Sequence, residues 1–253
     1  MRRAPVHSTR QVTASIGLSC YPDDGVDLPA AAAGKARNTP NEHSQEDSVI
    51  DLYTGNSSNG QRAAIALEEC GLDYRVHKYD LMKGEHRTPE FAAIAPAGAI
   101  PVIVDSDGPG GMALTLAQSC AIILYASEKT GKFMPKNFAT RALAWQWLMQ
   151  AATDVSPASA NIFYNTVLLP EKSEANGKFF VERALRCFGD ADHQLAEREY
   201  LAGDISVADF ALYPVYAVRK KILDEAGTLS NLARWAERMA TRPGVQKGMK
   251  AAE

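Results

Sequence analysis

The sequence contains few cysteines, and none is placed for pairing with another. Cys20, Cys70, Cys120 and Cys187 lie far apart and form no C-x-x-C motif. This spacing argues against a zinc site, a dithiol redox motif and a disulfide framework. We therefore expect a protein without a bound metal, whose chemistry does not depend on a cysteine pair.

Long apolar runs and a large net charge are also absent. No apolar run is long enough to span a bilayer, and the N-terminus has no apolar signal-peptide core. A net charge of −3 does not favour nucleic acid as a partner. With 253 residues, 46% of them hydrophobic, the chain is long enough for one large or two small globular domains. This composition predicts a cytoplasmic protein with neither a membrane nor a nucleic-acid partner.

Residues 1–48 differ in composition from the rest of the chain. Gln11–Tyr21 has the pattern of a single strand, whereas residues 35–48 are polar and aperiodic. We predict a poorly ordered extension or linker over residues 1–48. Residues 11–28 resemble the C-terminal part of a diguanylate cyclase (GGDEF) domain, but they lack the nucleotide-binding signature of that family. We interpret this piece as a remnant or an upstream extension.

Residues 49–131 are predicted to form a compact α/β unit. Ile50–Thr54 alternates as a strand does, and Gln61–Gly71 carries an apolar helix stripe that ends at a glycine. Further strands are expected at Tyr74–Asp80, Val102–Val104 and Met112–Thr115, and further helices after Thr88 and after Ser119. The resulting order, β-α-β-α-β-β-α, is that of a thioredoxin-like domain.

Residues 138–253 show no strand pattern and are predicted to be all helical. Helices are expected at Thr140–Ala152, Phe179–Leu195, Leu229–Met239 and Val245–Lys250. Ser206 and Asp209 have the spacing of a capping box, for which we expect a structural role. The predicted fold class is therefore α/β plus all-α, a thioredoxin-like N-terminal domain followed by an all-helical C-terminal domain.

The loop between the first strand and the first helix is a candidate anion site. Ser57, Ser58 and Asn59 lie at the predicted helix N-terminus, where unpaired N–H groups and the helix dipole favour a negative charge. The Ser57 hydroxyl and the Asn59 amide could hold a sulfur anion without any protein cysteine. The alternative is that these residues only cap the helix.

Several motifs in this order resemble the cytosolic glutathione transferases from about Val49 to the C-terminus. They are Ile100-Pro101 before the third strand, Gln118-Ser119 at the last helix of the α/β unit, and the Ser206-x-x-Asp209 box. Ile50–Tyr53 followed by Ser57–Gly60 is most similar to the bacterial nu class.

The resemblance implies glutathione as the co-substrate, with no metal, and it implies roles for particular residues. Ser57 and Asn59 would be the catalytic residues that hold the glutathione sulfur as a thiolate. The implied glutathione-binding residues are Asn59, Ile100, Pro101 (with a cis peptide bond), Gln118, Ser119 and Arg186, with Arg183 as the second choice for the arginine.

Two positions depart from the family pattern. Gln118 stands where the nu pattern has glutamate, and Ala99 stands where the family often has the lysine that contacts the glycyl carboxylate. Both departures weaken the expected hold on glutathione.

Other candidates have more ordinary explanations. Tyr53 could activate a thiol as in the tyrosine-type classes, but its place within a strand favours packing. Cys70 and Cys120 are expected in the core. His86 is expected at the surface or in contact with glutathione, and Asn161–Tyr164 could line a second-substrate pocket.

The expected function is that of a glutathione transferase or a glutathione-dependent disulfide-bond or peroxide reductase. The second substrate would be a small electrophile, disulfide or peroxide, and the family resemblance implies a homodimer. The alternative is a non-catalytic interaction module with a glutathione transferase fold, which the Ala99 and Gln118 departures leave open.

Overall fold

The structure, a computed structural model, describes residues 50–251 and 253. The strand and the GGDEF resemblance predicted within residues 1–48 lie outside the described residues. The N-terminal domain contains β1 (Ile50–Thr54), α1 (Ser58–Cys70), β2 (Tyr74–Lys78), α2 (Pro89–Ile94), β3 (Val102–Asp105), β4 (Leu114–Ala117) and α3 (Ser119–Thr130). The C-terminal domain contains α4 (Phe138–Gln150), α5 (Ser156–Phe163), α6 (Glu174–Gln194), α7 (Val207–Ala226), α8 (Ser230–Ala240) and α9 (Pro243–Lys250). The predicted fold class is confirmed.

The strands of the N-terminal domain form one sheet with the order β2-β1-β3-β4. β1 runs parallel to β2 and antiparallel to β3, and β3 pairs antiparallel with β4. The fourth strand was predicted two residues too early, at Met112–Thr115. Because β3 ends at Asp105 and its antiparallel partner is Leu114, pairing fixes β4 at Leu114–Ala117.

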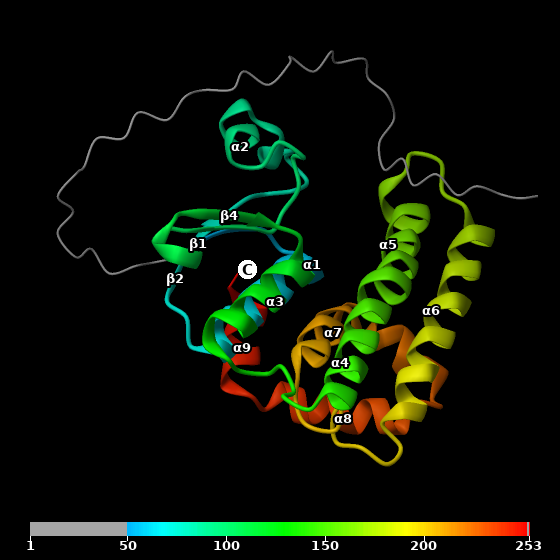
Figure 1. Cartoon of the computed structure of the whole chain (residues 1–253). Coiled ribbons are helices and arrows are strands. Elements are labelled where there is room, and N and C mark those ends of the chain that lie inside the picture. The colour runs from blue at the N-terminus through cyan, green and yellow to red at the C-terminus, as the bar shows by residue number, and fades with distance from the viewer. Residues whose placement is uncertain (1–49, 252) are drawn as a thin grey trace, which may run out of the picture. The chain divides into compact units, whose positions relative to one another are not determined.

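The two faces of the sheet are covered differently. Leu52 and Ile103 are cross-strand partners, and both are buried in the large core that α1 and α3 complete. Tyr53 and Val102 are the next pair along the ladder and pack with Phe91 of α2 on the opposite face. Figure 1 shows α2 on one side of the sheet and α1 with α3 on the other.

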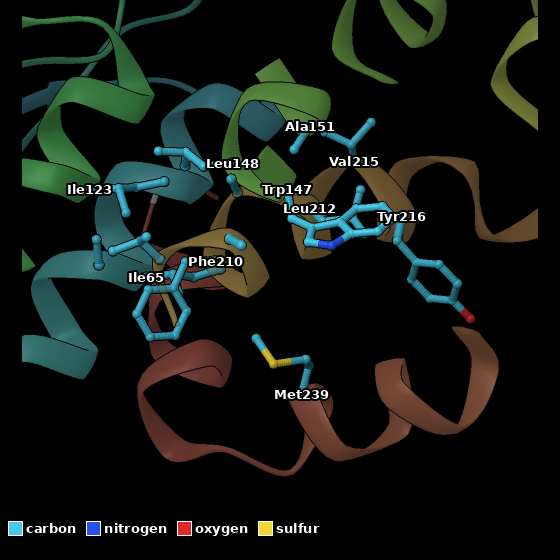
Figure 2. Close-up of a cluster of buried hydrophobic side chains, with 14 of the residues drawn as sticks. Ile65, Ile123, Trp147, Leu148, Ala151, Phe210, Leu212, Val215, Tyr216 and Met239 are labelled. Carbon is cyan, nitrogen blue, oxygen red and sulfur yellow. The ribbon is translucent and has the colours of Figure 1, made fainter. Parts of the chain in front are cut away.

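One hydrophobic core joins the sheet, α1 and α3 to the helical domain. Figure 2 shows Ile65 of α1 and Ile123 of α3 near Leu148 of α4 and Phe210 of α7. The start of α1 is therefore held by packing from both domains. No helix among residues 50–251 is long and apolar enough to cross a membrane.

The helix predicted at Thr140–Ala152 is too short, because α4 continues into α5 through a π-helical turn at Ala151–Val155. A second π turn, Tyr164–Leu168, follows α5. Proline normally ends an α-helix, since it has no N–H and its ring crowds the preceding turn. Here the hydrogen bonding changes from the α-helical to the π-helical pattern just before Pro157, since the N–H of Ser156 donates to the Ala151 carbonyl five residues earlier.

Candidate functional site

Ser57 lies at the N-terminus of α1, as expected, and caps it. Its Oγ accepts a hydrogen bond from the Gly60 N–H at 3.1 Å. A hydroxyl that accepts one bond still has its own O–H to donate. Capping and donation to a bound anion are therefore compatible at Ser57.

Gly60 brings this helix start close to the end of β1. A Cβ atom at Gly60 would lie 2.3 Å from Thr54 Oγ1 and 2.5 Å from the Gly55 carbonyl oxygen. Only glycine leaves room for this close contact, so the loop and its polar side chains are held close to the C-terminal end of β1.

Asn59 is the second residue of α1, and its side chain connects α1 to α3. Its Oδ1 accepts hydrogen bonds from Arg62 Nη1 at 2.9 Å and from Ser119 Oγ, at the start of α3, at 3.3 Å. The N-termini of α1 and α3 therefore meet at this amide.

The peptide bond between Ile100 and Pro101 is cis, as expected from the resemblance. It lies beside a cavity that is bordered by the starts of α1 and α3, by the segment before the cis-proline and by β3 and β4. The cavity is lined by Asn59, Ile94–Ala97, Ala99, Ile100, Pro101, Val102, Thr115, Ala117, Gln118 and Ser119. None of these lining residues is charged, and none is a cysteine.

Gln118 and Ser119 line the cavity where α3 begins, next to Asn59. Gln118 has a φ of +76°, which is rare for a residue with a side chain. Strain of this kind is common at binding sites, where the surrounding structure maintains it. Ser119 is the first residue of α3 and is buried.

This arrangement suits an extended peptide that carries negative groups. Two helix N-termini present unpaired N–H groups and the positive ends of their dipoles. The backbone beside the cis-proline can pair with a peptide as an added strand would. The site can therefore hold a carboxylate near Ser119 and a second anion near Asn59 and Ser57.

Two family models match the chain in succession. The model described as "Glutathione S-transferase, N-terminal domain" matches residues 56–129, and the model described as "Glutathione S-transferase, C-terminal domain" matches residues 154–251. The chain belongs to the glutathione S-transferase family. The resemblance read from the sequence is confirmed at this level, while the nu class and the GGDEF remnant stay predictions.

Curated relatives of this glutathione S-transferase family member include two oxidoreductases. Disulfide-bond oxidoreductase YfcG of Escherichia coli (strain K12) is 35% identical over 209 residues, which are 81% of this chain and 96% of the relative. Disulfide-bond oxidoreductase YghU of the same organism is 29% identical over 215 residues, which are 79% of this chain and 73% of the relative. The expected enzyme class, glutathione transferase or disulfide-bond oxidoreductase, is confirmed by these relatives.

Solved structures of the family share the fold and contain glutathione. A glutathione transferase from Pseudomonas putida, with one glutathione disulfide bound per subunit, has a TM-score of 0.75 and 28% identity, covering 82% of this chain and 93% of its own. A family member from Pseudomonas fluorescens with two glutathione molecules has a TM-score of 0.74 and 29% identity, covering 81% and 94%. These structures support glutathione as the expected co-substrate.

Most of the residues predicted for the site lie together in this glutathione transferase fold. Asn59, Ile100, Pro101, Gln118 and Ser119 all line the cavity. Ser57 is not among the lining residues, but it caps the helix that carries Asn59.

The structure does not bring Arg186 to the cavity. Arg186 is exposed on α6, and α6 packs against α5 and α8 rather than against the sheet. Its alternative, Arg183, lies 3.7 Å from Asp154 in an ion pair. The family often has a lysine at the position of Ala99, and α6 therefore supplies no cation in its place.

Tyr53 packs as predicted. Its ring stacks on His77 at a centroid distance of 4.5 Å and lies 6.4 Å from Phe91, on the face of the sheet that α2 covers. Burial, and then the charge of Asp51, raise the pKa of Tyr53.

His86 is buried rather than at the surface, and burial, with the neighbouring Arg87, lowers the pKa of His86. His86 does not line the cavity.

Sequence reasoning missed Arg62, which lies behind the cavity and holds Asn59. The available signal was a cation three residues after Asn59, immediately before the apolar run Ala63–Leu67. Residues three apart share a helix face, so Arg62 had to lie beside Asn59 on a helix that is buried on almost every side.

Proposed function

We propose that this chain is a glutathione-dependent enzyme that reduces small disulfides. The observation that carries the proposal is the Asn59 amide at the N-terminus of α1, on a cavity bordered by the cis Ile100–Pro101 bond and free of cysteine. The two oxidoreductases among the relatives support reduction over transfer to an electrophile.

Glutathione would lie along the cavity as an extended peptide. Ile100 would pair its backbone with the cysteinyl unit, and Ser119 with Gln118 would bind the γ-glutamyl carboxylate and amine. The sulfur would lie at the start of α1. There the Asn59 N–H groups and the Ser57 O–H would donate to the thiolate and favour ionisation of the thiol.

The reaction balances with glutathione as the only reductant. The thiolate of one glutathione attacks a sulfur of the substrate disulfide, so that a mixed disulfide forms and one substrate thiolate leaves and takes up a proton. A second glutathione thiolate attacks the glutathione sulfur of the mixed disulfide. The products are glutathione disulfide and two substrate thiols, and no protein cysteine changes its oxidation state.

Two features weaken the expected binding of the glycyl carboxylate of glutathione: Ala99 stands in place of a lysine, and Arg186 does not line the cavity. No charged residue lines the cavity to receive the glycyl carboxylate. We therefore expect a high KM for glutathione, since a charge-assisted hydrogen bond present in many relatives is missing.

The test is a comparison of substrates with the purified full chain and glutathione. Bis(2-hydroxyethyl) disulfide reduction is followed through glutathione disulfide formation, in parallel with 1-chloro-2,4-dinitrobenzene conjugation and cumene hydroperoxide reduction. We expect the disulfide to have the highest kcat/KM. Preference for the electrophile or the peroxide would contradict the proposed reaction. Retention on glutathione resin with no turnover of any substrate would support a non-catalytic interaction module.

A further inference from the structure

Arg62 is a buried cation at the junction of α1, α5 and α7. Only 2% of its surface is exposed. Its Nε donates to the Ala211 carbonyl at 2.6 Å, its Nη2 to the Ala151 carbonyl at 3.2 Å and Ser156 Oγ at 2.6 Å, and its Nη1 to Asn59 Oδ1 at 2.9 Å. All these acceptors are neutral, and no carboxylate of the described residues forms an ion pair with it.

The charge of Arg62 is therefore uncompensated, although four of its five N–H groups donate to neutral acceptors. Burying a cation without a counter-charge is costly even when its hydrogen bonds are made. Burial lowers the pKa of Arg62, and Cys120 of α3 is the titratable group that faces it and raises that pKa. An anion bound at Asn59 would supply the missing negative charge.

A π turn and helix α7 hold Arg62 in place. Ala151 begins the π turn, and its carbonyl also accepts a hydrogen bond from Ser156 Oγ. Ala211 lies in the first half of α7, and its carbonyl accepts the hydrogen bond from Arg62 Nε. The helical domain thus fixes the guanidinium, which in turn contacts the site in the other domain.

This contact decides which end of the Asn59 amide faces the cavity. A guanidinium only donates hydrogen bonds, so the amide oxygen must face Arg62. Ser119 Oγ donates to the same oxygen. The two N–H bonds of Asn59 Nδ2 are therefore left for the cavity, where a thiolate needs donors.

We propose that Arg62 is a positioning residue for the glutathione thiolate: it holds the Asn59 amide with its N–H groups toward the sulfur and places a positive charge behind them. This inference rests on the proposed function. A residue that served only to join the two domains would affect stability and leave the ionisation of bound glutathione unchanged.

The test measures the pKa of the bound glutathione thiol, from thiolate absorbance against pH, as a difference between samples with and without glutathione. The difference removes the signal of the protein's own cysteines. In Arg62→Met the thiol pKa should rise by about one unit or more, because a hydrogen bond to the anion is disordered and a positive charge is lost. In Arg62→Lys, which keeps the charge but not the planar fork, the rise should be smaller.

The matched control is Arg219→Met. Arg219 is half-buried between α7 and α5, where it donates to Ser159 Oγ at 2.8 Å and to the Ser159 carbonyl at 2.6 Å, without touching Asn59. This variant should leave the thiol pKa unchanged. In an Asn59→Ala background, Arg62→Met should produce a smaller rise than it does alone, because part of its effect acts through the amide. A thiol pKa that is unchanged in both Arg62 variants would overturn the inference.

A measurement on the wild-type chain covers the case in which both Arg62 variants unfold. The side-chain amide protons of Asn59, followed by NMR, should shift with glutathione ionisation if they donate to the thiolate. No shift, with a depressed thiol pKa, would overturn the role of Arg62 alone. A normal thiol pKa in the wild-type protein would instead contradict the proposed function.

Discussion

Gly248 of α9 lies directly against the backbone of Ile65 in α1. A Cβ atom at Gly248 would lie 2.5 Å from both the N and the Cα of Ile65. This close approach presses α9 onto the helix whose N-terminus carries Ser57 and Asn59. Arg242, just before α9, strengthens the same contact through an ion pair with Glu69 at 2.5 Å.

The Gly248→Ala substitution should destabilise the protein by about 1 to 3 kcal/mol, since the added methyl group has no room against a backbone. Urea unfolding measures this change. The control is Gly189→Ala in α6, where a Cβ atom would meet nothing within 4 Å. That variant should be neutral or more stable by about 0.5 to 1 kcal/mol, because alanine is the better helix former. Equal stability of the two variants would contradict the packing of α9 on α1.

The capping box of α7 contains a buried carboxylate. Asp209 Oδ1 accepts from the Leu201 N–H at 3.1 Å and from Trp235 Nε1 at 2.9 Å, and Oδ2 accepts from the Ser206 N–H at 2.9 Å and Ser206 Oγ at 3.1 Å. Burial raises the pKa of Asp209 to about 6, although these four hydrogen bonds lower it. The folded state then holds this proton more tightly than the unfolded state does.

The contribution of Asp209 to stability should therefore fall as pH rises from about 4 to about 6. Comparison with Asp209→Asn, which does not titrate, isolates the effect, because the other groups are common to both proteins. The difference in unfolding free energy between wild type and variant should decrease by up to about 3 kcal/mol over this range. A difference that grows with pH would mean that the four donors outweigh burial.

The exposed face of α4 suggests where a dimer would form. Phe138, Trp145 and Met149 are exposed and lie on one side of the helix by their spacing of seven and four. We expect the homodimer implied by the family resemblance to use this face. Trp145→Glu should weaken it roughly 100-fold, as loss of a central aromatic anchor does. Sedimentation would show a shift toward the 27.4 kDa monomer.

The matched control is Phe179→Glu, which changes an exposed aromatic residue of α6. It should leave the mass unchanged. A wild-type protein that sediments as a monomer at micromolar concentration would contradict the dimer, and an effect of Phe179→Glu alone would place the contact elsewhere.

Features that depend on neighbouring residues in the chain could be predicted from the sequence. Thr88 and Ser206 cap helices as expected, Ser57 lies at the start of α1 as expected, and Gly71 ends α1 with a φ of +72°. Helix caps satisfy backbone groups a few residues away, so their residue types carry the information.

Features that depend on distant contacts could not be predicted. The π turn that extends α4 past Pro157 is stabilised in part by the hydrogen bond from Arg62 to Ala151, two residues 89 positions apart. Arg62 lies in a stretch that reads as an ordinary amphipathic helix, and its burial depends on α5 and α7. Arg186 illustrates the same limit: its helix could be predicted, but not that the residue lies exposed on α6, outside the set of residues that line the cavity.

The sulfur site gives the last prediction. Ser57→Ala and Asn59→Ala should each raise the pKa of bound glutathione and lower kcat roughly 10- to 100-fold, since each removes a hydrogen bond worth about 1 to 3 kcal/mol to the anion. The effect on the KM for glutathione should be smaller, because the lost bond matters most to the ionised sulfur. Tyr53→Phe should do little, since the ring of Tyr53 lies between His77 and Phe91.

Ser57→Ala also removes the cap of α1, which would by itself cost about 1 kcal/mol of stability. Ser57→Thr is therefore the control, because threonine keeps both the cap and the hydroxyl and should restore most of the activity. Two measurements, made in parallel with rates, separate the two effects. Loss of the cap lowers the unfolding temperature in a thermal melt, whereas loss of the donor moves the thiol pKa in the thiolate absorbance against pH. If Tyr53→Phe abolished ionisation while Ser57→Ala and Asn59→Ala left it unchanged, this would be a tyrosine-type transferase and the donors at the start of α1 would only cap the helix.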